Sequence, residues 1–274
     1  MTTVRTEAVA GAFYPGEYQA LKSEVDSLLA NAPTPSLYAP SSAKPKAIIT
    51  PHAGYIYSGL TAASVYKTLE PLAEIIKRVV LLGPSHKVAF RGLAYSSADY
   101  FQTPLGKIPI DHAAIKTIQS LPQITEMDIA HTNEHSLEVQ LPFLQTVLKE
   151  FTLVPIVVGD AEPQEVAEVI DKLWGGEETL IVISSDLSHF HNYDQAREMD
   201  THTKHAIEEF RFNDLSYEDA CGRIPIQGLL KTAKERQLNI TTIDVRNSGD
   251  TAGEKDSVVG YGAWVLAYKT KSTH

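Results

Sequence analysis

The sequence predicts one α/β domain spanning residues 1–274, a layered fold with a mixed, largely parallel central sheet. Four short apolar runs alternate with segments of helical periodicity, as expected for strands buried on both faces between helices. Two apolar runs near the C-terminus are joined by a charged loop containing glycine, which predicts an antiparallel pair. With 43% hydrophobic side chains in 274 residues, one large core is favoured over two domains.

The elements follow in order along the chain. A helical pattern covers 16–30, and a stretch rich in Pro, Ser and Ala at 32–46 predicts an irregular connection to the first strand. The four inner strands are apolar runs ended by turn residues, at 47–50, 78–82, 154–158 and 180–184. Further helices are expected at 59–70, 111–120, 136–150, 162–174, 194–210 and 225–236, and the C-terminal strands at 240–245 and 258–268.

Composition argues against several classes of protein. The first residues lack a basic segment followed by an apolar one, and no stretch approaches about 18 apolar residues, so neither secretion nor membrane spanning is expected. The single cysteine, Cys221, excludes an internal disulfide framework and favours a cytoplasmic location. The net charge is −10 and the basic residues are scattered, so nucleic acid is not an expected partner.

Polar, turn-forming segments follow four predicted strands, where ligands collect in open α/β sheets. They cover 51–55, 83–86, 185–191 and 246–250, and three of them contain histidine. A lone histidine there is usually a hydrogen-bonded turn residue, but three such positions suggest a shared site. Two imidazoles and one anionic side chain would hold a transition metal with open positions for substrate and oxygen. We therefore expect His52 and His86, each beside a proline-containing turn, to be metal ligands.

A second polar group surrounds His135, at the start of a predicted helix. Ser136 is the expected N-cap, which would leave His135 facing outward, and Pro142 either kinks the helix or marks a later start. Glu138 is either a site acid or a first-turn carboxylate favoured by the helix dipole. Four leucines at helical spacing are expected to be core: Leu137, Leu141, Leu144 and Leu148.

The third, anionic ligand has competing candidates. Cys221 precedes a predicted helix, where the dipole and Arg223 would favour a thiolate, although free cysteine is more often an inert buried thiol. Asp250 would suit iron, with Gly249 giving the backbone freedom to turn, but an ordinary Asx-turn is the simpler interpretation. Water could also complete the site. The sequence contains no nucleophile elbow, phosphate-binding loop, dinucleotide fingerprint or H-E-x-x-H motif.

Seven ordered motifs then carry a resemblance to a known family: residues 8–16, 51–59, 82–86, 103–105, 134–142, 184–189 and 221–226. The chain resembles the Memo family over nearly its whole length. The resemblance implies a fold similar to class III extradiol ring-cleaving dioxygenases, with a pocket homologous to their iron site. It assigns His52, His86 and Cys221 to metal-ligand positions, whereas the dioxygenases have a carboxylate in the third place. It also implies, for prokaryotic members, a functional link to a radical-SAM protein.

Three functions remain open. The first is an oxidoreductase in which Fe²⁺ or copper activates oxygen toward an aromatic or phenolic small molecule, with His135, His189 and Asp186 as catalytic residues in the same pocket as the ligands. The second is a binding module for a partner peptide or protein that keeps the ancestral pocket. The third is a zinc-type hydrolase using the same residues.

Overall fold

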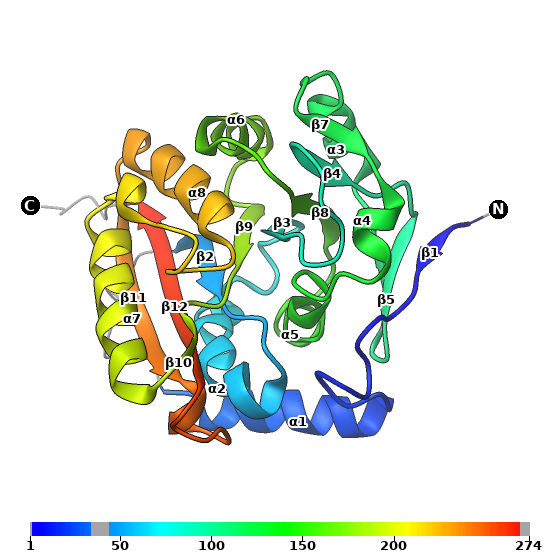
Figure 1. The fold of residues 1–274 in the computed structure, drawn as a ribbon. Helices are drawn as coiled ribbons and strands as arrows, with labels where there is room; N and C mark the ends of the chain where they lie inside the picture. The colour runs from blue at the N-terminus through cyan, green and yellow to red at the C-terminus, as the bar shows by residue number, and fades with distance from the viewer. Residues whose placement is uncertain (1, 34–43, 269–274) are drawn as a thin grey trace, which may run out of the picture.

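A nine-stranded mixed sheet forms the centre of the computed structural model, which describes residues 2–33 and 44–268 (Figure 1). Its inner strands are parallel neighbours in the order β2, β9, β3, β8. Their bounds are Pro45–Thr50, Thr179–Ser184, Arg78–Pro84 and Thr152–Val158. These are the four strands that the sequence predicts, and nearly all their residues are buried because helices cover both faces.

Antiparallel strands extend the sheet on both sides. β12 (Val258–Tyr268) pairs with β2, β11 (Leu238–Asn247) and β10 (His189–His191). On the other side, β4 (Leu93–Tyr95) is antiparallel to β8 and parallel to β7 (Ile124–Glu126). The predicted C-terminal antiparallel pair and the mixed character of the sheet are confirmed.

A small sheet at the N-terminal side was not predicted. It is ordered β1, β5, β6, with bounds Val4–Arg5, Tyr100–Thr103 and Gly106–Pro109. Strand β1 pairs with a segment almost a hundred residues away, Val4 lying opposite Tyr100. Strands this short carry no detectable periodicity, so only the tertiary structure defines them.

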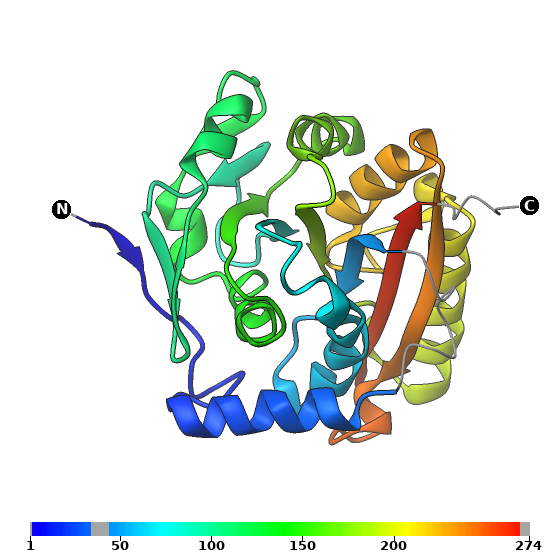
Figure 2. The same cartoon turned by 180° about the vertical axis from the view of Figure 1, so that it is seen from behind.

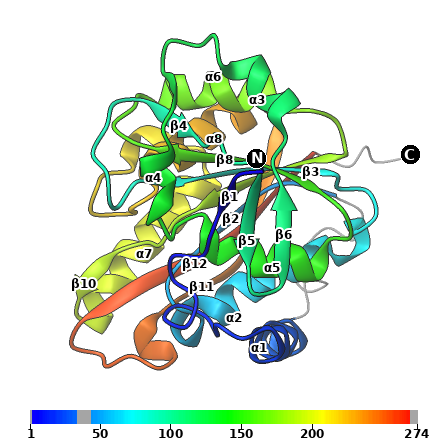
Figure 3. The same ribbon diagram turned by 90° about the vertical axis from the view of Figure 1, so that its right-hand side faces the viewer.

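Helices cover both faces of the large sheet (Figures 1 and 3). One face carries α1 (Tyr18–Asn31), α2 (Tyr55–Tyr66) and α5 (Leu141–Val147). Figure 2 shows α1 running beneath this group, in contact with α2 and α5. The other face carries α3 (His112–Ile118), α6 (Pro163–Leu173), α7 (Tyr193–Glu208) and α8 (Arg223–Glu235). Among the described residues, no helix is both long and apolar enough to cross a membrane.

The helix expected at 136–150 is the main correction to the predicted elements. A short helix α4 (Asp128–Thr132) precedes it, and a 3₁₀ turn, Glu138–Gln140, leads into α5, with Pro142 in the first turn. Of the two interpretations of Pro142, the later start is the observed one, because proline fits a first turn. Ser136 is not an N-cap; its hydroxyl donates to the carbonyl oxygen of Pro84 at 2.9 Å. The four leucines are buried, as expected.

Smaller differences concern boundaries. α2 begins at Tyr55 rather than near residue 59 and continues into a 3₁₀ segment, Lys67–Leu72. Two more 3₁₀ turns, Phe212–Asp214 and Ser248–Asp250, follow α7 and β11. Most of the irregular connection expected at 32–46 lies at 34–43, outside the described residues.

Candidate metal centre

Three histidine side chains meet at the carboxyl edge of the parallel strands. His52 follows β2, His86 follows β3, and His135 lies between α4 and the 3₁₀ turn. β2 and β3 flank β9 in parallel, so their ends reach the same edge. One ligand atom from each ring lies within 4.8 Å of the others. His52 and His86 thus occupy the shared position that the strand-end pattern predicts, and His135 joins them instead of facing outward.

Hydrogen bonding fixes the tautomer of His52. Its Nδ1 lies 2.9 Å from the Ser184 hydroxyl oxygen, and that hydroxyl donates its one proton to the carbonyl oxygen of Ser136 at 2.5 Å. The Ser184 oxygen must therefore accept from His52, so Nδ1 carries the hydrogen. The Nε2 lone pair is left free toward the site, as metal ligation requires.

The Gln140 amide gives this assignment a second support. Its Nε2 lies 2.8 Å from both the Pro51 carbonyl oxygen and the Ser184 oxygen, and its Oε1 accepts from the Tyr66 hydroxyl at 2.9 Å. A carbonyl oxygen only accepts hydrogen bonds, so the NH₂ group must face Pro51 and Ser184. Both bonds are fully buried, because Gln140 and Ser184 have no exposed surface.

Glu134 orients His86. Its carboxylate accepts from His86 Nδ1 at 2.9 Å and from the His86 backbone N–H at 2.5 Å. It also accepts from the Ser136 N–H at 2.9 Å. These bonds hold the pKa of the buried Glu134 carboxyl at about 2 although burial opposes ionisation. A carboxylate on Nδ1 leaves Nε2 of His86 free, an arrangement common for metal-bound histidine.

Burial keeps the imidazole rings of His52 and His135 neutral. Burial, together with the neighbouring His86 ring, lowers the pKa of His52 well below its usual range. The same two causes lower the pKa of His135 to about 4. Neutral imidazole is the form that binds metal ions. The side chain of His86 is 28% exposed, so the group opens to solvent on that side.

Cys221 lies beside His52. Its Sγ is 3.4 Å from His52 Nε2 and 3.7 Å from the Asp186 carbonyl oxygen. At this separation, Sγ and Nε2 would be close enough for one metal ion to bind both atoms. Burial raises the pKa of the Cys221 thiol to about 12, opposite to the shift expected from Arg223 and the helix dipole, so only a bound metal ion would convert this thiol to the thiolate.

The two other predicted pocket residues border this group. Asp186 accepts from the His52 backbone N–H at 2.8 Å, and its second oxygen is 3.9 Å from His52 Nε2. Burial raises the pKa of Asp186 to about 7. Burial lowers the pKa of His189, in β10, and the nearby His86 ring lowers it further.

Two carboxylates that the sequence offered as candidates, Asp250 and Glu138, form other contacts. β11 runs parallel to β2, so Asp250 follows a strand end at the same edge, yet it is exposed and accepts from the Tyr193 hydroxyl at 2.5 Å. It also caps its own 3₁₀ turn, in agreement with the interpretation as a turn residue. Glu138 does stand in a first turn, that of the 3₁₀ segment Glu138–Gln140, as the second interpretation had it. It is fully buried and forms an ion pair with Arg5.

Glu134, Ser184 and Gln140 are the residues that sequence reasoning missed. Glu134 and Ser184 stand within family motifs next to predicted site residues, which is the one signal that could have found them. Gln140 sits on a 3₁₀ turn whose position the sequence did not predict.

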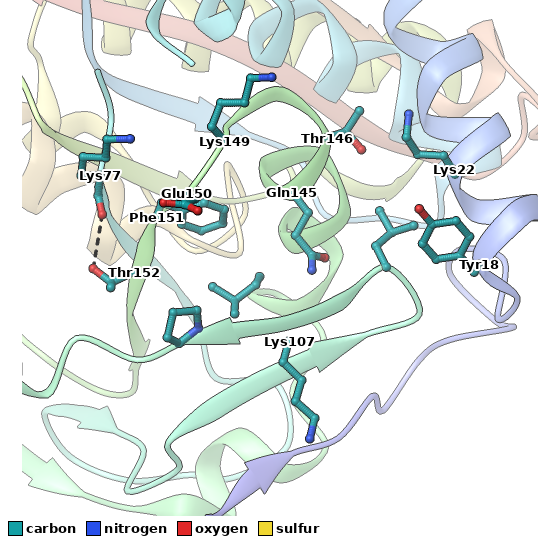
Figure 4. Close-up of a pocket in the computed structure, with 13 residues that line it drawn as sticks. Tyr18, Lys22, Lys77, Lys107, Gln145, Thr146, Lys149, Glu150, Phe151 and Thr152 are labelled. Carbon is teal, nitrogen blue, oxygen red and sulfur yellow. Dashed lines mark hydrogen bonds between the residues drawn. The ribbon is translucent and has the colours of Figure 1, made fainter. Parts of the chain in front are cut away.

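Two cavities help to place the functional surface. One, of about 680 Å³, is lined by four lysines, Lys22, Lys77, Lys107 and Lys149 (Figure 4). It lies at the amino ends of β3 and β8, at the opposite end of β3 from His86, and none of the predicted site residues lines it. A second cavity, of about 510 Å³, is lined by Cys221 and by Ser85, the neighbour of His86. The second cavity therefore adjoins the candidate centre.

Comparison with known proteins agrees with the sequence motifs. The model of the family described as Memo-like protein matches residues 5–265. A MEMO1 family protein of Aquifex aeolicus is 40% identical, over 94% of this chain and 97% of that protein. One of Sulfolobus acidocaldarius is 34% identical over the same shares. The crystal structure of uncharacterized protein JW3007 from Escherichia coli K12 covers 80% of this chain and 98% of its own, with TM-score 0.51 and 13% identity, which shows similarity of fold alone. The chain belongs to the Memo-like protein family.

Proposed function

We propose that this protein is a metal-dependent oxidoreductase whose centre is built on His52, His86 and Cys221. The observation that carries the proposal is the convergence of the His52, His86 and His135 imidazoles within 4.8 Å, with Nδ1 of His52 and His86 hydrogen-bonded and Nε2 free. Cys221 is not part of this three-histidine group, and its place as a ligand rests on its contact with His52 and on the family motif. The Cys221 thiol contacts His52 at a separation compatible with a shared ion. Imidazole and thiolate together suit iron, copper or zinc better than a hard ion such as Mg²⁺.

When bound, Fe²⁺ or copper would activate dioxygen and transfer single electrons. The chain's own residues supply orientation and proton transfer: Ser184 and Glu134 hold the two ligand rings, while His135, Asp186 and His189 stand beside the centre as candidate acids and bases. The adjoining cavity of about 510 Å³ would admit a small aromatic or phenolic substrate. A single cysteine fits a reducing compartment, and we place the activity in the cytoplasm.

A zinc hydrolase is the second candidate, and one observation favours it. Three imidazoles, one of them oriented by the Glu134 carboxylate, form a donor set that also holds catalytic zinc. Zinc would then activate a water molecule instead of oxygen.

The test is metal analysis of protein purified anaerobically without an affinity tag. We expect about one equivalent of iron or copper, and its loss in His52→Gln and His86→Gln. His202→Gln is the matched control, because His202 is an exposed residue of α7. Retention of full metal content in both site variants would refute the proposed centre.

Activity separates the two candidates. Oxygen uptake with a panel of phenols should require iron or copper and should stop under anaerobic conditions. Ester or amide hydrolysis by the zinc-loaded protein that persists without oxygen would instead establish the hydrolase.

A further inference from the structure

The cavity beside Cys221 has one wall built from the start of α8. Cys221, Arg223 and Ile224 line it there, and Ser85, Phe90 and Tyr217 contribute to the rest. The thiol proposed as a ligand and the Arg223 guanidinium thus lie two residues apart and border the same space. A molecule in this cavity would be adjacent to the metal centre.

The cations of this cavity differ in how they are paired. The Arg91 guanidinium donates to both carboxylate oxygens of Glu165, at 2.7 and 3.0 Å, and to the Asp160 carbonyl oxygen at 2.8 Å. The half-buried Arg223 side chain forms no hydrogen bond or ion pair with any residue of 2–33 or 44–268. A guanidinium presents five N–H donors in a rigid fork, so Arg223 keeps its full capacity to bind an anion.

Phe90 provides an apolar part of the lining, and its backbone is held in place. Phe90 packs against Gly159, where an added Cβ would come within 2.4 Å of the Phe90 carbonyl oxygen. That oxygen also accepts from the Asp160 N–H at 2.8 Å. Glycine at 159 therefore permits the close approach that fixes Phe90 in place. Phe90 and Ile224 are both partly buried hydrophobic residues packed on the core.

We infer that this cavity binds an organic carboxylate, with its apolar body between Phe90 and Ile224 and its carboxylate on Arg223. One unpaired guanidinium matches one carboxylate in a two-bond fork, whereas a dianionic phosphate would call for more positive charge. The α8 dipole, positive at Arg223, adds to the attraction. The inference rests on the proposed function in one respect: the bound acid is taken to be the substrate of the adjoining centre.

The test compares phenylacetate with its uncharged amide, phenylacetamide, by calorimetric titration of the anaerobically purified full chain. The wild type should bind phenylacetate at least about tenfold more tightly than the amide, the usual scale for one charge-assisted pair. Arg223→Gln should remove that preference while binding the amide as before. Arg236→Gln is the matched control, because it removes the same charge from the C-cap of α8, where Arg236 pairs with Asp171.

Each outcome has a distinct meaning. A preference that survives in Arg223→Gln, or a wild type that binds neither compound, would overturn the inference, provided far-ultraviolet circular dichroism shows folded protein. If the wild type holds no metal but shows the Arg223-dependent preference, the acid-binding cavity stands and the oxidoreductase proposal fails. If metal is bound and the preference is absent, only the inference fails.

Discussion

Substituting Glu138 by glutamine tests the buried ion pair between Arg5 and Glu138, which joins the N-terminal segment to the segment that carries His135. Glu138 accepts four hydrogen bonds and has no exposed surface. One oxygen accepts from the Val9 N–H at 3.0 Å and the Tyr14 hydroxyl at 2.5 Å. The other accepts from Arg5 and from the Ala8 N–H at 2.8 Å. A glutamine amide has one oxygen, so its NH₂ group must face two of these donors.

The expected cost follows from these contacts. Each hydrogen bond to a charged group contributes about 1.5–3 kcal/mol, and breaking a buried ion pair costs about 3–5 kcal/mol because the remaining charge stays buried. We therefore expect Glu138→Gln to lower the free energy of unfolding by about 3–5 kcal/mol. The Arg5 guanidinium also donates to the His131 and Glu134 carbonyl oxygens, at 3.0 and 2.7 Å. Its displacement should loosen the segment before His135 and weaken metal binding.

Urea unfolding followed by far-ultraviolet circular dichroism measures the loss. Glu74→Gln is the control, because Glu74 is exposed and makes no ion pair or side-chain hydrogen bond with the described residues; its effect should stay within about 0.5 kcal/mol. A loss below about 1 kcal/mol in Glu138→Gln would show that solvent reaches the pair and that the reasoning from burial is wrong.

Three further predictions concern the core, the third ligand and pH. Leu144→Ala should cost about 2–5 kcal/mol in urea unfolding and leave metal content per folded molecule unchanged, since Leu144 is fully buried away from the ligands. Anaerobic titration should show Cys221→Ser weakening Cu(I) or zinc binding far more than Mn²⁺ binding, whereas Asp250→Asn changes neither; wild-type affinity in Cys221→Ser would remove that ligand. Burial raises the pKa of Asp200 from its ordinary value to about 6. The folded protein therefore holds this proton more tightly than the unfolded chain, so the contribution of Asp200 to stability is lost as the pH rises from about 4 to about 6. Asp200→Asn keeps an acceptor for the Ser188 N–H but does not ionise. Between pH 4 and pH 7 its free energy of unfolding should therefore rise by about 2–3 kcal/mol relative to that of the wild type. Stability curves that stay parallel over this pH range would contradict the prediction.

The inner strands were predictable because their signal is local. β2, β3, β8 and β9 are apolar along their length, and each observed strand contains the predicted one with at most two additional residues at either end. The pairing of β1 with β5 carries no such signal, since it depends on contacts between distant segments. The helix expected from residue 136 failed for a related reason. Ser136 is committed to a hydrogen bond with Pro84 across the fold, which outweighs its local preference for capping.

The candidate site was predictable as far as strand ends define it. His52 and His86 were found because parallel topology alone brings their segments together. His135 was also expected in this pocket, and its ring does lie with those of His52 and His86, although Ser136 does not cap a helix there as the sequence suggested. For Cys221 the sequence left open both a thiolate and an inert thiol, and the burial that raises its pKa cannot be read from the sequence.

The hydrogen bonds behind His52 have a fixed direction, and this limits which residue can relay protons. Every proton from Tyr66 through Gln140 and Ser184 is already assigned to an acceptor, and the series ends on the Ser136 carbonyl oxygen. Ser184 cannot take the Nδ1 proton of His52 without giving up its own to a backbone carbonyl, which does not hold one. Protons therefore cannot pass between His52 and the protein interior through Ser184. A proton that reaches or leaves the His52 ring must therefore pass on its Nε2 side, where Cys221, Asp186, His86 and His135 lie.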